Sequence, residues 1–281
     1  MNVQHFYDSE TSTLSYIVYD SHSKDAVIID PVLDYDPASG FVEGHSFQKL
    51  VNFIKEHHLK PLYCFETHAH ADHLSSSQYL KAEFPNLIVA ISENIKFVQK
   101  TFKEILELPS DTDVQGLHFD KLIKPNELIM AGTIKIEAIP TPGHTPACMS
   151  FHINNMVFCG DALFIEDYGT GRCDFPGGSA AALYHSVHDK LYKLPDETIV
   201  FVGHDYQPNS RELRFETTIG ISKLQNNQLK EVTSKESFVT LRESRDRTLK
   251  VPRLLFASIQ VNIQAGKLPS FLRLPIFKKI N

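Results

Sequence analysis

Short apolar runs alternate with longer amphipathic stretches along most of the 281-residue chain. The apolar runs are bounded by polar residues, glycine or proline and predict strands, at residues 14–19, 26–30, 61–65, 87–91, 134–139, 156–159 and 198–202. The amphipathic stretches have apolar residues at helical spacing and predict helices, over residues 46–58, 74–84, 93–106, 180–191, 210–230 and 235–249. A further apolar segment covers 252–266, and the proline-containing end, 267–281, is expected to be irregular. The alternation predicts an α/β fold in which helices cover a two-sheet core.

Four of the predicted strands run directly into a histidine or an aspartate. The residues at these strand ends are the stretch 66–73, His144, Asp161 and His204. Side chains at the same edge of a sheet layer can meet in one cleft while the strands hold them rigidly. The pattern therefore predicts a single site that gathers residues from distant parts of the sequence.

The stretch 66–73, Glu-Thr-His-Ala-His-Ala-Asp-His, has the highest density of metal-binding side chains in the chain. His68 and His70 alternate along extended chain, so that both imidazoles project to the same side. Asp72 and His73 follow in the turn and can face the same point from another direction. Imidazole and carboxylate are common ligands of zinc and iron, whereas unpaired charges are rare in a packed core. The stretch therefore predicts a metal site.

The spacing His-x-His-x-Asp-His resembles the signature of the metallo-β-lactamase superfamily, and with the later strand ends the resemblance covers roughly residues 10–210. It implies an αββα sandwich followed by a small helical C-terminal extension. It also implies a site that can hold two metals. In this chain every ligand position of the family is filled: His68, His70 and His144 for one metal, Asp72, His73 and His204 for the other, and Asp161 as the bridge.

The superfamily contains hydrolases and oxygenases, so the fold leaves the reaction open. In glyoxalase II, two zinc ions activate a water that attacks a glutathione thioester. In persulfide dioxygenases, one Fe(II) is held by two histidines and a carboxylate, and the matching residues here are His68, His144 and Asp161. These enzymes oxidise glutathione persulfide with O₂ to sulfite and glutathione, in sulfide detoxification. The remaining positions then surround the iron, as hydrogen-bonding partners of its ligands or as a second metal site, namely His70, Asp72, His73 and His204.

The segment after Asp161 favours the oxidative chemistry. The run 171–175, Gly-Arg-Cys-Asp-Phe, resembles a Gly-Arg-x-Asp-Phe segment of persulfide dioxygenases that glyoxalase II lacks. We therefore expect a non-haem dioxygenase of glutathione persulfide, or of a related thiol persulfide, with one Fe(II) per chain. A glyoxalase-II-type hydrolase with two Zn(II) is the alternative. A third interpretation, a metal-buffering or regulatory protein, is disfavoured because it needs neither open coordination positions nor a cleft.

Arginines near the predicted site are candidates for binding the substrate, because a guanidinium can hold a carboxylate of glutathione through two hydrogen bonds. Arg172 is the only arginine before residue 211. An equally good interpretation is that Arg172 pairs with Asp174 and orders its own loop. Further candidates for the substrate pocket are Tyr206, Arg211 and Arg214.

Charge is distributed unevenly along the chain. The net charge is −6, yet residues 211–281 contain 14 Lys and Arg against 6 Asp and Glu. This part has no run of basic residues and many apolar ones, so a folded lobe that receives a small anion is favoured over nucleic-acid binding. We expect a catalytic domain at 1–210 and a helical extension at 211–281 packed on it.

Other features bear on the compartment. No apolar stretch reaches the roughly 18 residues of a membrane span, and the start lacks a signal-peptide pattern. The four cysteines have no C-x-x-C spacing and fit a reducing compartment. These features predict a cytoplasmic protein without a membrane or nucleic-acid partner, and the resemblance is compatible with a homodimer.

Overall fold

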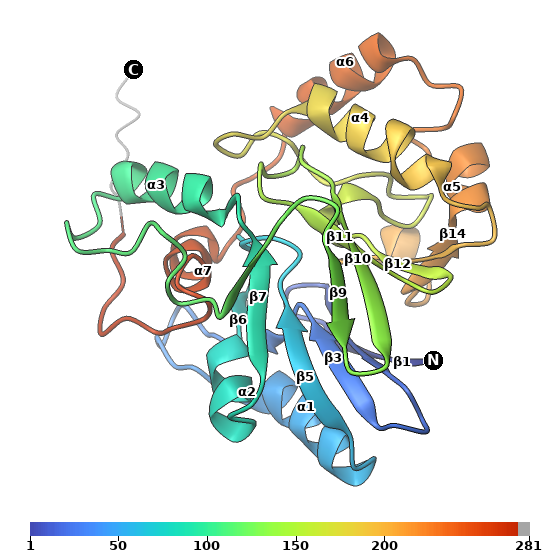
Figure 1. The fold of residues 1–281 in the computed structure, drawn as a ribbon. Coiled ribbons are helices and arrows are strands. Elements are labelled where there is room, and N and C mark those ends of the chain that lie inside the picture. Colours follow the sequence, from blue (N-terminus) through green and yellow to red (C-terminus); the bar gives the residue numbers. More distant parts are fainter. Residues whose placement is uncertain (275–281) are drawn as a thin grey trace, which may run out of the picture.

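Two six-stranded sheets stacked face to face form the centre of the molecule (Figure 1). The computed structural model describes residues 1–274. The first sheet has the order β1 (Asn2–Asp8), β2 (Thr13–Tyr19), β3 (Asp25–Ile29), β5 (Lys60–Phe65), β7 (Ile88–Ser92), β8 (Lys121–Ile123). The second has the order β14 (Glu216–Thr218), β13 (Ile199–Phe201), β12 (Met156–Phe158), β11 (Met149–Ile153), β10 (Ile134–Pro140), β9 (Leu128–Ala131). A separate antiparallel pair consists of β4 (Val32–Leu33) and β6 (Leu74–Ser75).

The main core lies between the two sheets. Phe65 of the first sheet faces Phe151 of the second, with ring centroids 4.7 Å apart, and Tyr16 of the first sheet packs against Phe158 of the second, with centroids 5.2 Å apart. Strands β3, β5, β7 and β8 are parallel to one another. Parallel strands are covered on both faces and read as continuous apolar runs, which is why the sequence pattern identified β3, β5 and β7.

Helices cover the outer faces of both sheets, so the predicted αββα sandwich is confirmed (Figure 1). On the first sheet lie α1 (His45–Glu56), α2 (Ser77–Glu83), α3 (Ile95–Ile105) and α7 (Leu255–Asn262). On the second lie α4 (Ala180–Asp189), α5 (Ile219–Gln225) and α6 (Lys235–Asp246). Helix α1 illustrates the packing: its buried apolar residues follow helical spacing and pack in the core cluster of the first sheet, as Phe47, Leu50, Val51 and Ile54.

The prediction of a helix over 210–230 is wrong. Residues 211–215 are irregular, β14 follows, and α5 covers only seven residues. β-Branched threonines favour a strand here: β14 pairs with β13, and the side chain of Thr218 then caps α5 by accepting a hydrogen bond from the Ile221 N–H at 3.2 Å. The helix expected from residue 74 begins at Ser77, because β6 pairs with β4. Strands β1, β4, β8, β9 and β11 were not predicted either. The irregular end expected over 267–281 is described only to residue 274.

The C-terminal extension reaches both layers of the sandwich. Helix α6 packs against α4 beside the second sheet, and Phe238 enters the main core. Helix α7 packs on β6, and Ile259 joins the core of the first sheet. Residues 247–254, called here the connecting segment, join α6 to α7. Because β14 is an edge strand of the second sheet, that sheet continues beyond the expected boundary at residue 210.

Two further features concern the chemistry of the chain. Within residues 1–274, no helix is long and apolar enough to cross a membrane. All four cysteines are free and buried. Burial raises the pKa of the Cys148 and Cys159 thiols to about 12, so both remain protonated at neutral pH.

Candidate metal centre

The candidate ligands lie on loops that leave the ends of β5, β10, β12 and β13, as the sequence pattern predicted. Two of these loops pack so tightly that only glycine fits before the ligand. Gly143 has a φ of +150°, and a Cβ there would lie 2.4 Å from Leu183 Cα of α4. Gly160 has a φ of +50°, and its Cβ would lie 2.5 Å from Thr67 Oγ1. These contacts hold the following ligand, His144 or Asp161, close to the 66–73 stretch.

All seven predicted metal-site residues come together. The ligand atoms lie within 4.8 Å of one another in each of two groups, His68 with His144 and Asp161, and His70 with Asp72 and His73. His204 joins the two groups, because its Nε2 is 3.4 Å from Asp72 Oδ2 and 3.4 Å from Asp161 Oδ1. The arrangement therefore offers ligand atoms for one metal or for two.

Several buried atoms of this cluster have no hydrogen-bond partner in the described part of the chain, and these are His68 Nε2, His70 Nδ1, His73 Nε2 and Asp161 Oδ1. Each such atom costs about 1–3 kcal/mol of stability when nothing satisfies it. Imidazole and carboxylate lone pairs gathered in one place match the donor set of a divalent transition metal. The residues present therefore fit a bound metal.

Outer hydrogen bonds fix the tautomers of the histidines. His144 Nδ1 donates to the Arg172 carbonyl at 2.6 Å, so the lone pair of this ring lies on Nε2. His70 Nε2 donates to Asp30 Oδ1 at 3.0 Å, which leaves the lone pair on the unpartnered Nδ1. A carbonyl and a carboxylate can only accept, so both assignments follow from the contacts.

Asp30 organises the support under the metal-binding loop. Its carboxylate accepts from the Thr67 N–H at 2.7 Å and from Thr67 Oγ1 at 2.8 Å, in addition to His70. Burial disfavours charge on Asp30 and His70, but their mutual attraction outweighs burial, lowering the pKa of Asp30 and raising that of His70. Glu66 Oε2 adds a second carboxylate 3.4 Å from His70 Nε2. Sequence reasoning missed the role of Asp30, although Asp30 is the last residue of the strand predicted at 26–30.

Asn262, the last residue of α7, holds the backbone of the same loop. Its Nδ2 donates to the carbonyls of His70 at 2.9 Å and His73 at 2.7 Å, while its Oδ1 accepts from the Ser75 N–H at 2.8 Å. The Asn262 side chain is buried. A residue almost 190 positions away therefore fixes the path of the main metal-binding stretch, and no local sequence signal identifies it.

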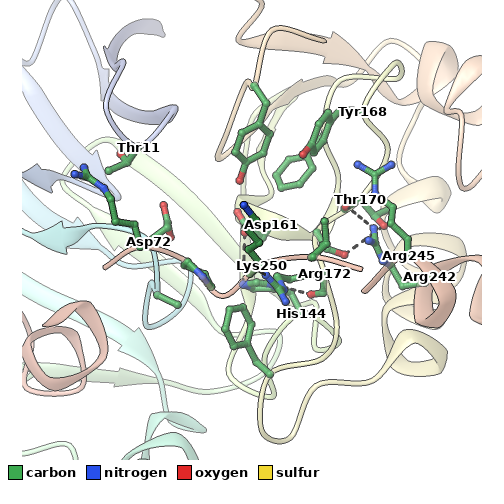
Figure 2. A pocket seen from close by; sticks show the side chains of 18 of the residues that line it. Thr11, Asp72, His144, Asp161, Tyr168, Thr170, Arg172, Arg242, Arg245 and Lys250 are labelled. Atoms are coloured by element: carbon green, nitrogen blue, oxygen red, sulfur yellow. Dashed lines mark hydrogen bonds and ion pairs between the residues drawn. The ribbon is translucent and has the colours of Figure 1, made fainter. Parts of the chain in front are cut away.

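A cavity of about 290 Å³ opens onto the metal cluster (Figure 2). Asp72, His144 and Asp161 lie on its wall, so a molecule in the cavity can reach the ligand atoms. The aromatic part of the wall consists of Phe164, Tyr168, Phe175 and Tyr206. The end of α6 and the connecting segment complete it, with Arg245, Lys250 and Arg253 among their residues. The volume is close to the lower end of the range for small-molecule sites, which is about 300–1,000 Å³.

The predicted substrate-binding residues are placed differently from one another. Tyr206 and Arg172 line the cavity, whereas Arg211 and Arg214 do not. Arg211 pairs with Asp167 and with Asp205, at 2.5 and 2.7 Å. Arg214 pairs with Glu166 at 2.7 Å. The structure therefore does not bring these two arginines to the cavity, because carboxylates beside them already take up their guanidinium groups.

Arg172 has its guanidinium occupied. Its Nε and Nη2 donate to the two oxygens of Asp174, at 2.6 and 2.7 Å, and its Nη1 donates to the Lys250 carbonyl at 2.7 Å. The same guanidinium lies 5.2 Å from the centre of the Phe175 ring. These contacts match the loop-ordering interpretation and also tie the loop to the connecting segment.

A buried ion pair of α6 supports the loop that contains Arg172. Arg242 Nη2 is 2.6 Å from Asp246 Oδ1, and both side chains are almost fully buried. Arg242 Nη1 donates to the Thr170 carbonyl at 3.0 Å (Figure 2). Asp246 Oδ2 accepts from the Cys173 N–H at 2.8 Å. The pair therefore fixes the residues on either side of Arg172, whose carbonyl orients His144.

Comparison with known proteins agrees with this geometry. The sequence matches the family model of the metallo-beta-lactamase superfamily over residues 9–204. "Glyoxylase B2" of Dictyostelium discoideum is 43% identical, over 98% of this chain and 96% of its own length. The human "persulfide dioxygenase ETHE1, mitochondrial" is 34% identical, over 73% of this chain and 68% of its own. The crystal structure of ETHE1 from Myxococcus xanthus matches with a TM-score of 0.76 and 30% identity, over 95% of this chain and all of that one. The chain therefore belongs to the metallo-beta-lactamase superfamily.

Proposed function

We propose that this protein is a persulfide dioxygenase that holds one Fe(II) between His68, His144 and Asp161. The observation that carries the proposal is this group of two imidazoles and one carboxylate, with ligand atoms within 4.8 Å of one another beside a cavity. Such a ligand set leaves coordination positions open, as in non-haem Fe(II) oxygenases. The human relative named persulfide dioxygenase ETHE1 supports the same activity, as does the structural similarity to the ETHE1 of Myxococcus xanthus.

The proposed substrates are O₂ and glutathione persulfide or a related thiol persulfide. One persulfide, one O₂ and one water give one thiol, one sulfite and two protons. The sulfur–sulfur bond breaks, the two sulfur atoms together lose four electrons, and O₂ accepts all four. The reaction therefore needs no further reductant.

The chain's own residues hold and orient the site. Bound iron would supply the redox chemistry and the place where O₂ and the persulfide sulfur meet. The Arg172 carbonyl keeps a proton on the outer nitrogen of His144, so the inner nitrogen faces the metal position. Asp30 does the same for His70, which lies beside the iron ligands rather than among them in this proposal.

Tyr206 provides a hydrogen-bond donor at the cavity wall. Its ring stacks on His204, with centroids 5.4 Å apart. Burial, together with the Asp161 and Asp72 carboxylates, raises the pKa of Tyr206 well above its ordinary value. The hydroxyl therefore stays protonated at neutral pH and can donate to an anionic group of the substrate.

Oxygen uptake tests the proposal. Protein purified without oxygen and loaded with Fe(II) should consume one O₂ per sulfite formed when glutathione persulfide is added. The zinc-loaded protein is the matched control and should consume none. Iron-loaded protein that binds the metal but neither takes up O₂ nor forms sulfite would contradict the proposal.

A binuclear hydrolase of glutathione thioesters is the second candidate. The observation that favours it is the second group, His70 with Asp72 and His73, in which His73 Nε2 also lacks a hydrogen-bond partner. The Dictyostelium relative named glyoxylase supports the same alternative. Hydrolysis of S-lactoylglutathione by protein that holds two Zn(II) per chain, without O₂ uptake by the iron form, would establish the hydrolase instead.

A further inference from the structure

The turn between β1 and β2 packs directly against the metal cluster. Within it, Ser12 has a φ of +58°, a left-handed backbone conformation that is uncommon for a residue other than glycine. Backbone hydrogen bonds join the turn to the strand end that carries His204. The Ser12 carbonyl accepts from the Asp205 N–H at 3.1 Å, and the Leu14 N–H donates to the Gly203 carbonyl at 2.9 Å. The strained turn is therefore part of the construction of the site.

The first residue after the turn, Thr13, lies among three of the candidate metal ligands. Its side chain is buried, at the start of β2. Thr13 Oγ1 is 3.3 Å from Asp72 Oδ2, 3.4 Å from His73 Nδ1 and 3.4 Å from His204 Nδ1. These are the three residues that the family resemblance assigns to the second of two metals. One hydroxyl from β2 therefore contacts every residue of this set.

The partners of Thr11 fix the direction of these hydrogen bonds. Thr11 lies at the same end of the cavity as Asp72 (Figure 2). Its hydroxyl donates to Asp8 Oδ2 at 2.6 Å, because an ionised carboxylate can only accept, so the single hydroxyl proton of Thr11 is used there. Thr13 must then donate to Thr11 Oγ1, which lies 2.8 Å away. With its own proton used, Thr13 Oγ1 acts as an acceptor for ring N–H groups.

His73 and His204 therefore both carry a proton on Nδ1. His204 Nδ1 also lies 3.2 Å from the Ser12 carbonyl, and His73 Nδ1 lies 3.2 Å from Asp72 Oδ2. A carbonyl and an ionised carboxylate can only accept, so these contacts require the same protons. The inner nitrogens then face the cluster: His73 Nε2 has no hydrogen-bond partner within residues 1–274, and His204 Nε2 faces the Asp72 and Asp161 carboxylates. Both rings are thus turned so that Nε2 can bind a metal.

We propose that Thr13 is a positioning residue that enables Asp72, His73 and His204 to bind a second metal ion tightly. Asp72 Oδ2 is the nearer acceptor for the His73 ring N–H. A metal held by this carboxylate would compete for the same oxygen, and the Thr13 hydroxyl then offers the N–H another acceptor. Without the hydroxyl, metal binding would leave a buried N–H unpaired. The proposal goes beyond the proposed function, because it concerns the position beside the iron triad and not the reaction.

Stepwise zinc binding tests the proposal. Metal-free protein is titrated with Zn(II) in competition with a chelating dye, which gives a separate dissociation constant for each ion bound. Thr13→Val removes the hydroxyl and keeps the branched shape of the side chain, whereas Thr13→Ser keeps the hydroxyl. Thr217→Val is the matched control, because Thr217 is a buried strand threonine whose hydroxyl donates to Glu166 and not to a metal-site residue.

We expect Thr13→Val to bind the first zinc like the wild type and the second about tenfold more weakly or worse, as when outer hydrogen-bond partners of metal ligands are removed. Thr13→Ser and Thr217→Val should bind both ions like the wild type. Thr11→Val, at a partly exposed position, should weaken the second zinc by a smaller factor and provides the test if Thr13→Val does not fold. A wild type that binds one zinc only, an unchanged second zinc in the folded variants, or equal weakening of both ions would overturn the proposal.

Nuclear magnetic resonance of isotope-labelled histidine rings gives a readout that a general loss of stability would not produce. In the zinc-loaded wild type, the Nδ1 protons of His73 and His204 should exchange slowly with water. Thr13→Val should speed the exchange at His73, whereas His144, whose Nδ1 proton is held by the Arg172 carbonyl, should not change. Equal exchange at His73 in both proteins would also refute the role of Thr13.

The outcome for Thr13 is separable from the outcome for the reaction. A second zinc that depends on Thr13, in a protein whose iron form takes up no O₂ with glutathione persulfide, would refute the dioxygenase and retain the positioning role. O₂ uptake matched by sulfite, together with a second zinc that is unaffected in Thr13→Val, would retain the dioxygenase and refute the positioning role.

Discussion

The two sides of the cavity are built in different ways. On the metal side, His68, His70 and His73 are at most 2% exposed, and several hydrogen bonds to buried groups set their orientation. On the side formed by α6 and the connecting segment, Arg245 is half-buried and Lys250 is exposed, and neither has an acidic partner among the described residues. The first side fixes atoms in place before any ligand arrives. The second side offers charge that can adjust to the ligand.

Both sides nevertheless depend on the C-terminal extension. Asn262 holds the metal side through three hydrogen bonds to backbone groups. The Arg242–Asp246 ion pair holds the loop of the substrate side. Removing one partner of a buried ion pair leaves an uncompensated charge, whereas removing a neutral amide leaves only unpaired polar groups. The two sides should therefore respond differently to substitution.

The largest effect is expected from removing an iron ligand. His144→Ala or Asp161→Ala should abolish stoichiometric iron binding and the activity together, because each residue supplies one ligand of the proposed triad. Metal analysis of the purified variants and O₂ uptake measure the two losses in parallel. An alanine variant at either position that retains full iron occupancy would refute the assignment.

The buried ion pair comes next. Arg242→Met should lower the free energy of unfolding by about 3–5 kcal/mol, because it leaves the Asp246 carboxylate buried without its partner. The double variant Arg242→Met/Asp246→Leu should recover part of this loss. Urea unfolding followed by circular dichroism gives the values.

The same helix supplies the control for this pair. Glu243 on α6 and Arg247 just beyond its end have the same i,i+4 spacing, but their side chains are 57% and 75% exposed. Arg247→Met should therefore cost less than about 1 kcal/mol. Equal losses of unfolding free energy in Arg242→Met and Arg247→Met would show that the buried ion pair stabilises the protein no more than the exposed one.

A smaller effect on stability, but a specific effect on the metal, is expected at Asn262. Asn262→Ala should lower the free energy of unfolding by about 1–3 kcal/mol. It should also weaken metal binding roughly tenfold or more, as loss of the hydrogen bonds that orient metal ligands does in other metal sites. Gln260→Ala is the matched control, since Gln260 is a buried amide of the same helix whose bonds go to Phe256 and Arg273. Competition with a chelator should show weaker metal binding only in the Asn262 variant.

The contrast between the two sides also explains what the sequence could reveal. The metal side was predictable because His68, His70, Asp72 and His73 lie within six residues at the end of an apolar strand. The cations of the substrate side were not, because their position depends on how α6 packs and on the path of the connecting segment between two layers of the sandwich. Arg211 and Arg214 looked equally suitable in the sequence, yet nearby acids hold them away from the cavity. Proximity along the chain identifies ligands on one loop, but not which of several arginines lacks an acidic partner.

The smallest effect is expected at Arg172, which lies where the two sides meet. Its guanidinium is bound by Asp174 and by the Lys250 carbonyl, while its own carbonyl orients His144. Arg172→Gln keeps the backbone carbonyl, so iron content should not change. The KM for glutathione persulfide should rise about two- to fivefold, in line with loss of a partly exposed ion pair with Asp174 and of the hydrogen bond to the Lys250 carbonyl. Because this effect is indirect, it should not depend on the carboxylates of the substrate. The KM for the persulfide of glutathione diethyl ester, in which both carboxylates are esterified, should therefore rise by a similar factor through disorder of the shared cavity wall. A rise confined to the charged substrate would instead place Arg172 in direct contact with a carboxylate, and wild-type kinetics for both would limit Arg172 to ordering its loop.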